Sequence, residues 1–408
     1  MPRAALAVAI PLACCLAPAA ARAQEVTGSG SLGAGMFGRQ PATTAEVGID
    51  LAGPGYALGL GARGRWLSSD GFRGEEWDEL SEQARVVRYG TAAWSDGEPG
   101  GVALSAALGE LGAVSLGHRA IIDGYSSGLD VDHGHLGAQA RAQSGRVSGE
   151  LVVDDLVAAR IAGVRVATAA PGDLVLGVSL AGDRVAPAME GADSAVVAAA
   201  ALDGELRARS EGDGARGALT ADLVGIAGLA AGLHLGATGD ALVAGGVRLG
   251  ARAELRAGSR HYLPGWIGPL YEIERRRMTA ADGAMESGQL DVARAGGLFG
   301  IGAAGGLTAS ADGLVSGEVG YAARRGVSDL VTARVLAPFH DHFQAGLWSA
   351  AAVDGDRLDA LALAAEARLI LRSRMFLRAD AARLVRDDDG LLRPVWLAQL
   401  AFGASLGD

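Results

Sequence analysis

Polar and apolar residues alternate one by one along much of this chain. In residues 251–257, the charged side chains of Arg252, Glu254 and Arg256 are separated by alanines and a leucine. Residues 202–209 repeat the pattern with different residues. Successive side chains of a β-strand point to opposite faces, so this period of two predicts strands with one polar face and one apolar face.

Such strands follow one another with short turns between them, beginning with 26–39, 44–51 and 56–67. Turns rich in Gly, Pro and Asp are predicted at 53–55, 96–100, 171–173 and 387–390. The strand-plus-turn unit recurs roughly every 15–18 residues, the spacing expected for a transmembrane barrel. We therefore predict an all-β fold: a single antiparallel up-and-down transmembrane barrel with an even number of strands, roughly 16 to 22.

The apolar faces of these strands need a partner, and a bilayer around a closed barrel supplies one. After the first residues of the chain, no stretch reaches the roughly 18 consecutive apolar residues that a transmembrane helix needs. The apolar content is instead dispersed in alternation, as a transmembrane barrel requires.

The N-terminus has the features of a secretory signal peptide. A basic start at Arg3 precedes an apolar run over 4–17, and Ala-Arg-Ala at 21–23 is a small-residue cleavage site. The expected division is a signal peptide at 1–23 and a barrel at 24–408. The apolar run is too short and too rich in proline to be a membrane-spanning helix. The alternatives are an ordinary N-terminal core helix and a lipoprotein leader, and the residues before Cys14 and Cys15 make a poor lipobox.

Charge and cysteine content exclude several classes of function. The net charge is −11, and removal of 1–23, with its two arginines and no acid, makes it −13, which disfavours nucleic-acid binding. Cys14 and Cys15 are the chain's two cysteines, and both lie in the leader. The mature chain can therefore form no disulfide, thiolate metal site or cysteine nucleophile.

The C-terminal segment carries a resemblance to a known class. In residues 396–406, every second side chain is apolar or aromatic, including those of Trp396, Leu400 and Phe402. This segment resembles the last strand of Gram-negative outer-membrane β-barrel proteins, although the chain ends at Asp408 rather than at an aromatic residue. The resemblance implies residence in the cell outer membrane, with outer-membrane lipid and the barrel assembly machinery as partners.

The polar faces of the strands are predicted to line a pore, since a wide barrel keeps water inside. The predicted pore-lining residues are Arg63, Arg65, Glu205, Arg207, Arg209, Arg252, Glu254, Arg256, Glu366, Arg368, Arg378 and Asp380. This set holds eight arginines and four acids, and rings of arginine favour anions. We expect a porin-like channel for passive diffusion of small polar solutes, with a weak preference for anions.

Three connections are longer than a turn: 68–88, 120–134 and 258–287. The first is predicted to hold a short amphipathic helix that presents Trp77, Leu80 and Ala84 on one face. The third is a candidate binding or constriction loop because it combines aromatic residues with arginine. Its candidate residues are Tyr262, Trp266, Tyr271, Arg275, Arg276 and Arg277.

Two alternatives to a channel stay open. One is a barrel without transport, a structural or adhesion protein that presents the loop at 258–287. The other is a secreted β-repeat protein such as a solenoid, although no fixed short repeat is present.

No enzyme, cofactor or metal is expected. The Gly-x-Gly-x-x-Gly matches are explained by chance, because 63 of the 408 residues are glycine. Two His-x-His pairs, at 133/135 and 340/342, lack identifiable further ligands. No nucleophile elbow and no Ser/His/Asp set stands out.

The predicted strand faces also lead us to expect different effects of mutation on the stability of the barrel. Leu206→Arg or Leu255→Arg should destabilise the barrel by roughly 2–4 kcal/mol if the position is near the midplane. Arg207→Ala or Glu254→Ala should cost little, because a wet lumen imposes no burial on these charges.

Overall fold

The computed structural model describes residues 25–405, apart from positions 78, 99, 129–134, 187–194, 210–213, 244–245, 276–277, 280–285, 288, 297–299, 312–314, 325, 338–342, 355–356, 373–374 and 387–391. The predicted signal peptide at 1–23 and the turn predicted at 387–390 lie outside the described residues. No helix in the described part of the chain combines the length and the apolar character needed to cross a membrane.

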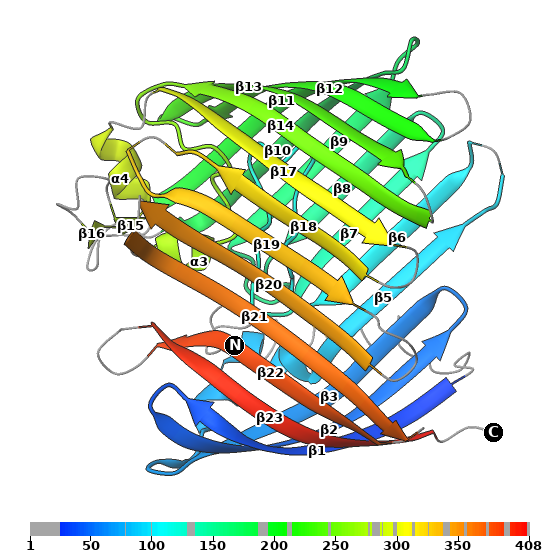
Figure 1. Cartoon of the computed structure of the whole chain (residues 1–408), viewed down its shortest axis with the longest axis vertical. Helices are drawn as coiled ribbons and strands as arrows, with labels where there is room; N and C mark the ends of the chain where they lie inside the picture. Colours follow the sequence, from blue (N-terminus) through cyan, green and yellow to red (C-terminus); the bar gives the residue numbers. More distant parts are fainter. Residues whose placement is uncertain are drawn as a thin grey trace.

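The described chain forms one large antiparallel sheet of long, tilted strands (Figure 1). The strands of its first half are β1 (Glu25–Phe37), β2 (Gln40–Gly53), β3 (Tyr56–Leu67), β4 (Gly71–Phe72), β5 (Val87–Ser95), β6 (Val102–Gly109), β7 (Gly137–Ser144), β8 (Val147–Val153), β9 (Ile161–Ala169) and β10 (Leu174–Ala186). Those of its second half are β11 (Ala195–Arg209), β12 (Ala215–Ile226), β13 (Ala230–Leu242), β14 (Val247–Gly258), β17 (Gly300–Ala311), β18 (Val315–Ala322), β19 (Asp329–Ala337), β20 (Phe343–Asp354), β21 (Arg357–Arg372), β22 (Met375–Arg386) and β23 (Leu392–Ser405).

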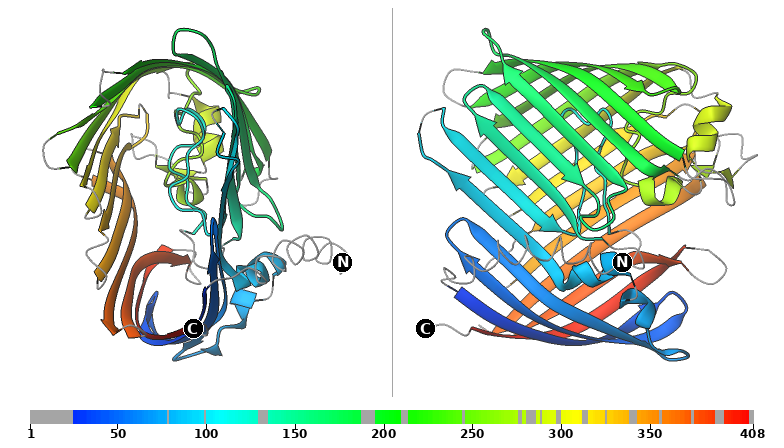
Figure 2. Two further views of the ribbon diagram at one scale, coloured as in Figure 1. Left: turned by 90° about the vertical axis from the view of Figure 1, so that its right-hand side faces the viewer. Right: turned by 180° about the vertical axis from the view of Figure 1, so that it is seen from behind.

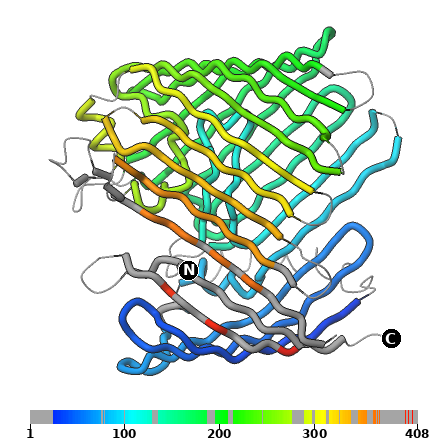
Figure 3. Tube along the Cα trace, viewed as in Figure 1, coloured from blue at the N-terminus to red at the C-terminus, as the bar shows by residue number. Residues whose placement is uncertain are grey.

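The sheet closes on itself, because β1 pairs with β23 from Thr27↔Ser405 to Phe37↔Val395. Every other wall strand pairs with its neighbours in chain order, so the trace in Figure 3 steps around the barrel hairpin by hairpin. The sheet has 21 strands in the described residues, and β4 and β5 both pair with β3 and share one place in the wall. The wall thus has twenty strand positions, and the predicted barrel with an even number between 16 and 22 is confirmed.

The segment between β4 and β5 interrupts one wall strand. It contains the short helices η1 (Gly74–Trp77), α2 (Leu80–Gln83) and η2 (Ala84–Val86) and lies outside the barrel in Figure 2. The helix predicted for 68–88 is therefore present, but its predicted apolar face is wrong. Leu80 is exposed, whereas Ser81 and Glu82 are buried.

The two rims of the barrel differ in their connections. At the rim where β1 begins and β23 ends, the strands are joined by turns of a few residues, such as 54–55 and 145–146. The two longest connections, 110–136 and 259–299, both leave from the opposite rim. We name them the first and second inner loops, because Figure 2 shows their described parts inside the barrel.

The second inner loop has its own short elements. They are α3 (Tyr271–Glu274), α4 (Gln289–Ala295) and the two-residue strands β15 (Met278–Thr279) and β16 (Glu286–Ser287). It pairs with the first inner loop through a parallel bridge between Ile122 and Ile267, both almost fully buried. The main apolar core of the protein therefore lies inside the barrel, where the two loops pack on the inner wall.

Candidate functional site

The outer face of the wall is an apolar band. On β10, the side chains of Leu176, Val178 and Leu180 are about half exposed, whereas Ser179 and Asp183 on the alternate face are buried. On β14, Leu255 points outward while Glu254 and Arg256 point inward and are buried. A closed barrel with this outward apolar band is suited to a bilayer, because each wall strand pairs with a strand on both sides and the sheet has no open edge.

The aromatic residues of the second inner loop anchor it to the inner wall. Tyr262, Trp266 and Tyr271 are each at most 3% exposed. The hydroxyl of Tyr271 donates a hydrogen bond of 2.8 Å to the carboxylate of Asp183 on β10. Burial raises the pKa of Tyr271 well above its ordinary value, so this hydroxyl acts as a donor.

The charged residues around α3 form a second set of anchors. Tyr125 of the first inner loop donates to Glu272 at 2.8 Å, and Arg275 donates to the backbone oxygen of Val185 at 2.7 Å. Burial alone would raise the pKa of Glu272, but the charges of Arg160 and Arg275 outweigh burial and lower it. The candidate loop residues Tyr262, Trp266, Tyr271 and Arg275 are thus packed inside the fold; Arg276 and Arg277 lie outside the described residues.

Glu254 connects both inner loops to the wall. Its carboxylate accepts hydrogen bonds from Arg252 and, at 2.5 Å, from Arg256, and lies 2.8 Å from Nδ1 of His234. His234 Nε2 lies 2.6 Å from the hydroxyl of Tyr262 in the second loop. Arg252 donates to the backbone oxygen of residue 118 in the first loop at 3.1 Å.

This arrangement corrects one sequence-based expectation. Glu254 is 6% exposed, so it is not a solvated charge on a wet lumen wall. Its removal would leave two guanidinium groups and an imidazole without their shared carboxylate. We therefore no longer expect Glu254→Ala to cost little.

A cavity of about 720 Å³ remains inside the barrel between the first inner loop and strands β11 to β20. Its charged lining residues are Arg119, Arg207, Arg216, Arg252, Arg256, Arg334, Asp123, Glu205, Asp240, Glu318 and His118. Four members of the predicted pore-lining set, Glu205, Arg207, Arg252 and Arg256, are among them. Sequence analysis missed the other lining residues, although Arg216 follows the same alternation on β12 and could have been found by the same pattern.

Arg63 and Arg65, two further described members of the predicted pore-lining set, are not among the lining residues of this cavity. Arg63 forms an ion pair of 2.7 Å with Glu46, and Arg65 is 2% exposed and packs over the ring of Phe37. The side chains of Arg209, Glu366, Arg368, Arg378 and Asp380 lie outside the described residues. The backbone register alone sets Glu366 opposite Asp380 and Arg368 opposite Arg378.

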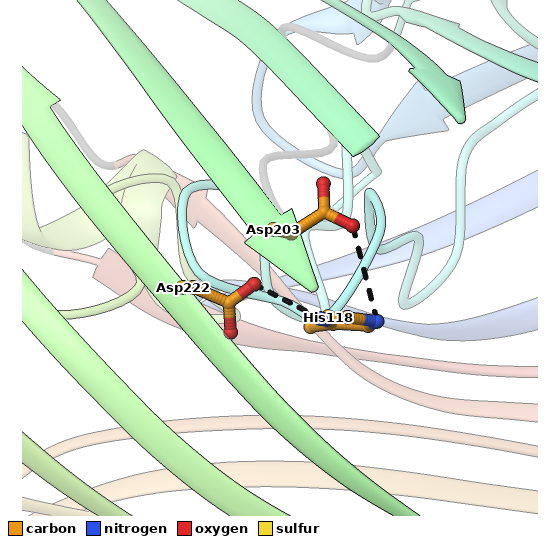
Figure 4. A group of neighbouring side chains, drawn as sticks. All are labelled: His118, Asp203 and Asp222. Carbon is orange, nitrogen blue, oxygen red and sulfur yellow. Dashed lines mark hydrogen bonds and ion pairs between the residues drawn. The ribbon is translucent and has the colours of Figure 1, made fainter. Parts of the chain in front are cut away.

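His118 of the first inner loop reaches the inner wall beside this cavity (Figure 4). Its Nδ1 lies 2.9 Å from Asp222, and its Nε2 lies 3.3 Å from Glu205. Burial alone would lower the pKa of His118, but the hydrogen bond to Asp222 and the nearby carboxylates outweigh burial and raise it. No sequence pattern marked this histidine, because its partners lie on strands about a hundred residues away along the chain.

The assembly strand predicted at the C-terminus is β23, which closes the barrel against β1. Phe402 on this strand is exposed on the wall, and the side chains of Trp396 and Leu400 lie outside the described residues. Of the histidine pairs, His135 is described and buried beside Asp155, whereas 133, 340 and 342 lie outside the described residues.

The fold and the lumen together define the class: this chain is a transmembrane antiparallel β-barrel with a porin-like architecture. No family model matches the sequence, and no curated protein matches it. Solved structures similar to the chain include a BenF-like porin from Pseudomonas fluorescens Pf-5, with 12% identity, 94% of this chain and 98% of that chain covered, and a TM-score of 0.37.

Two further similar structures come from Pseudomonas aeruginosa and Acinetobacter baumannii. OccK8 (OprE) of Pseudomonas aeruginosa has 12% identity, coverage of 94% of this chain and 97% of that chain, and a TM-score of 0.39. OccAB2 of Acinetobacter baumannii has 9% identity, coverage of 94% and 97%, and a TM-score of 0.37. Likenesses with TM-scores below 0.5 do not assign this chain to a family.

Proposed function

We propose that this chain is an outer-membrane channel for passive diffusion of small polar solutes. The observation that carries the proposal is the charged cavity inside a closed barrel whose outer face is apolar. Short turns face the periplasm in barrels of this kind and longer loops face outside. The inner loops would then enter the lumen from the extracellular rim and narrow the path.

Location is tested by fractionation. We expect the mature chain in the outer-membrane fraction, with a folded form that migrates faster on a gel than the heated form. The reason is that a closed barrel without an open sheet edge is expected to keep its fold in detergent until it is heated. Recovery of folded protein from the periplasm without detergent would contradict the proposal and would favour a secreted β-repeat protein.

The charge of the cavity supports a weak preference for anions. Its lining holds six arginines against four carboxylates, and excess arginine in a pore favours anions. Arg216 and Arg334 are the informative positions, because both line the cavity, and the register sets Arg216 opposite Asp240 and Arg334 opposite Glu318.

We expect reversal potentials in a KCl gradient across a planar bilayer to show anion preference. The double variant Arg216→Gln and Arg334→Gln should lower that preference, because it removes two of the six positive charges of the lining. Arg39→Gln, in the exposed turn between β1 and β2, is the control and should leave it unchanged. Absence of any conductance would instead favour the non-transporting structural or adhesion barrel, and cation preference would show that the cavity does not set selectivity.

A further inference from the structure

A histidine of the first inner loop meets carboxylates from two neighbouring wall strands (Figure 4). Asp203 on β11 and Asp222 on β12 lie directly opposite each other in the register of the sheet. His118 lies between them, and one ligand atom from each of the three side chains falls within 4.8 Å of the others. The side chains of Asp203 and Asp222 are only 3% and 4% exposed.

The charges of this cluster do not balance. Like charges directly opposite on neighbouring strands are unfavourable. Two arginines partly offset them: Arg165 donates to Asp203 and Glu150, and Arg207 donates to Glu205. The charged groups of the wall are thus four carboxylates and two guanidinium groups: Glu150, Asp203, Glu205, Asp222, Arg165 and Arg207. Before His118 is counted, these six groups carry two net negative charges, and a local excess of negative charge attracts cations.

The geometry around Nε2 of His118 suits a metal ion. This atom lies 3.3 Å from Oε2 of Glu205 and 4.0 Å from Oδ1 of Asp203. Two ligands of a tetrahedral ion with bonds of about 2.0–2.2 Å are about 3.3–3.5 Å apart. The separation from Glu205 already matches this value, and the separation from Asp203 exceeds it by about half an ångström. The same Oδ1 of Asp203 also accepts a hydrogen bond from Arg165, which would remain on this carboxylate beside the ion.

The other ring nitrogen of His118 is held as in a metal site. Its Nδ1 lies 2.9 Å from Oδ1 of Asp222, in position to donate a hydrogen bond. Metal-ligating histidines almost always donate their second ring N–H to a carboxylate, a carbonyl or water, which fixes the tautomer and the direction of the ring. Oε2 of Glu205 also remains accessible, because Arg207 contacts mainly the other oxygen, at 2.6 Å.

We propose that His118, Asp203 and Glu205 bind one divalent transition-metal ion of the Zn²⁺ type, with Asp222 orienting the imidazole. The ion would join the first inner loop to strand β11 and hold the loop beside the cavity. This site differs from the histidine pairs noted in the sequence, for which no further ligands were identified. The proposal does not depend on conduction, since the site exists in the folded barrel whether or not solutes pass.

The test is calorimetric titration of Zn²⁺ into the folded full-length barrel, purified without a histidine tag and treated with EDTA. We expect one ion per chain. His118→Ala should weaken binding at least tenfold, and Asp222→Ala should weaken it by about 10- to 100-fold, the usual effect of losing an orienting partner. His261→Ala is the matched control: this loop histidine contacts the backbone oxygen of Ala293 and should be silent.

A second measurement needs no variant and covers the case in which His118→Ala does not fold. Co²⁺ bound to the wild-type barrel should show the visible absorption of a tetrahedral site, which Zn²⁺ should abolish by displacement. A spectrum that stays that of the hydrated ion would overturn the proposal. Zn²⁺ binding that is equally tight in His118→Ala would also overturn it and would leave His118 as a simple ion-pair partner of the wall.

Discussion

Replacing Glu254 with alanine should destabilise the barrel by about 3–5 kcal/mol, the cost of leaving buried charges without their partner. Glu254 is 6% exposed, and its carboxylate is shared by Arg252, Arg256 and His234. Arg256 is itself 3% exposed, so water cannot replace the lost oxygen atoms. The measurement is urea unfolding from lipid vesicles.

The matched control is Asp240→Ala on the neighbouring strand β13. Asp240 also bonds an arginine, Arg248, but both side chains of that pair are about one third exposed. Exposed ion pairs contribute at most about 1 kcal/mol. Equal losses for Glu254→Ala and Asp240→Ala would show that the inner loops do not seal this part of the lumen.

Leu202→Arg should destabilise the barrel by roughly 2–4 kcal/mol, the range for an arginine on the lipid face at the bilayer midplane. Leu202 is 57% exposed on the outer face, midway along β11. Leu206 is on the same face, four residues nearer the rim where β1 begins and β23 ends. At about 3.3 Å per residue along a strand tilted by about 40°, it lies about 10 Å from Leu202 along the membrane normal.

Leu206→Arg should therefore cost less than Leu202→Arg, because the penalty falls to roughly 0–1 kcal/mol near the interface. Arg207→Ala is the control on the opposite face: this side chain points into the lumen, is 43% exposed and should change stability little. The expected order in urea unfolding from vesicles is Leu202→Arg, then Leu206→Arg, then Arg207→Ala. Similar losses in all three would mean that the faces of β11 are wrongly assigned.

The sequence was sufficient to predict the wall because the determining signal is local. Alternation in 202–209 and 251–257 assigns each side chain to a face without knowledge of any other strand. The predicted strands at 26–39 and 56–67 correspond closely to β1 and β3. The closure of β23 on β1 agrees with the assembly-strand interpretation of the C-terminus at the level of the backbone.

The lumen was predicted less well, because a strand pattern separates two faces but does not say what covers the inner one. Tyr262 and Trp266 in a long loop suggested a binding or constriction loop, but the sequence did not show that both side chains are buried as anchors of a loop that folds inward. The sequence indicated no packing partner for apolar loop residues such as Ile122. The fold places Ile122 beside Ile267 of the second inner loop.

By itself, the sequence determined the barrel and the polar or apolar identity of its wall faces, whereas it left the strand number as a range. These follow from residue alternation and from the requirement that every backbone group in a membrane be paired. Only the tertiary structure decided that two loops fill part of the lumen, that Glu254 is buried, and that His118 meets Asp203 and Asp222. Those contacts join residues far apart in the chain. Their energies depend on how deeply the residues are buried, which the local sequence pattern does not indicate.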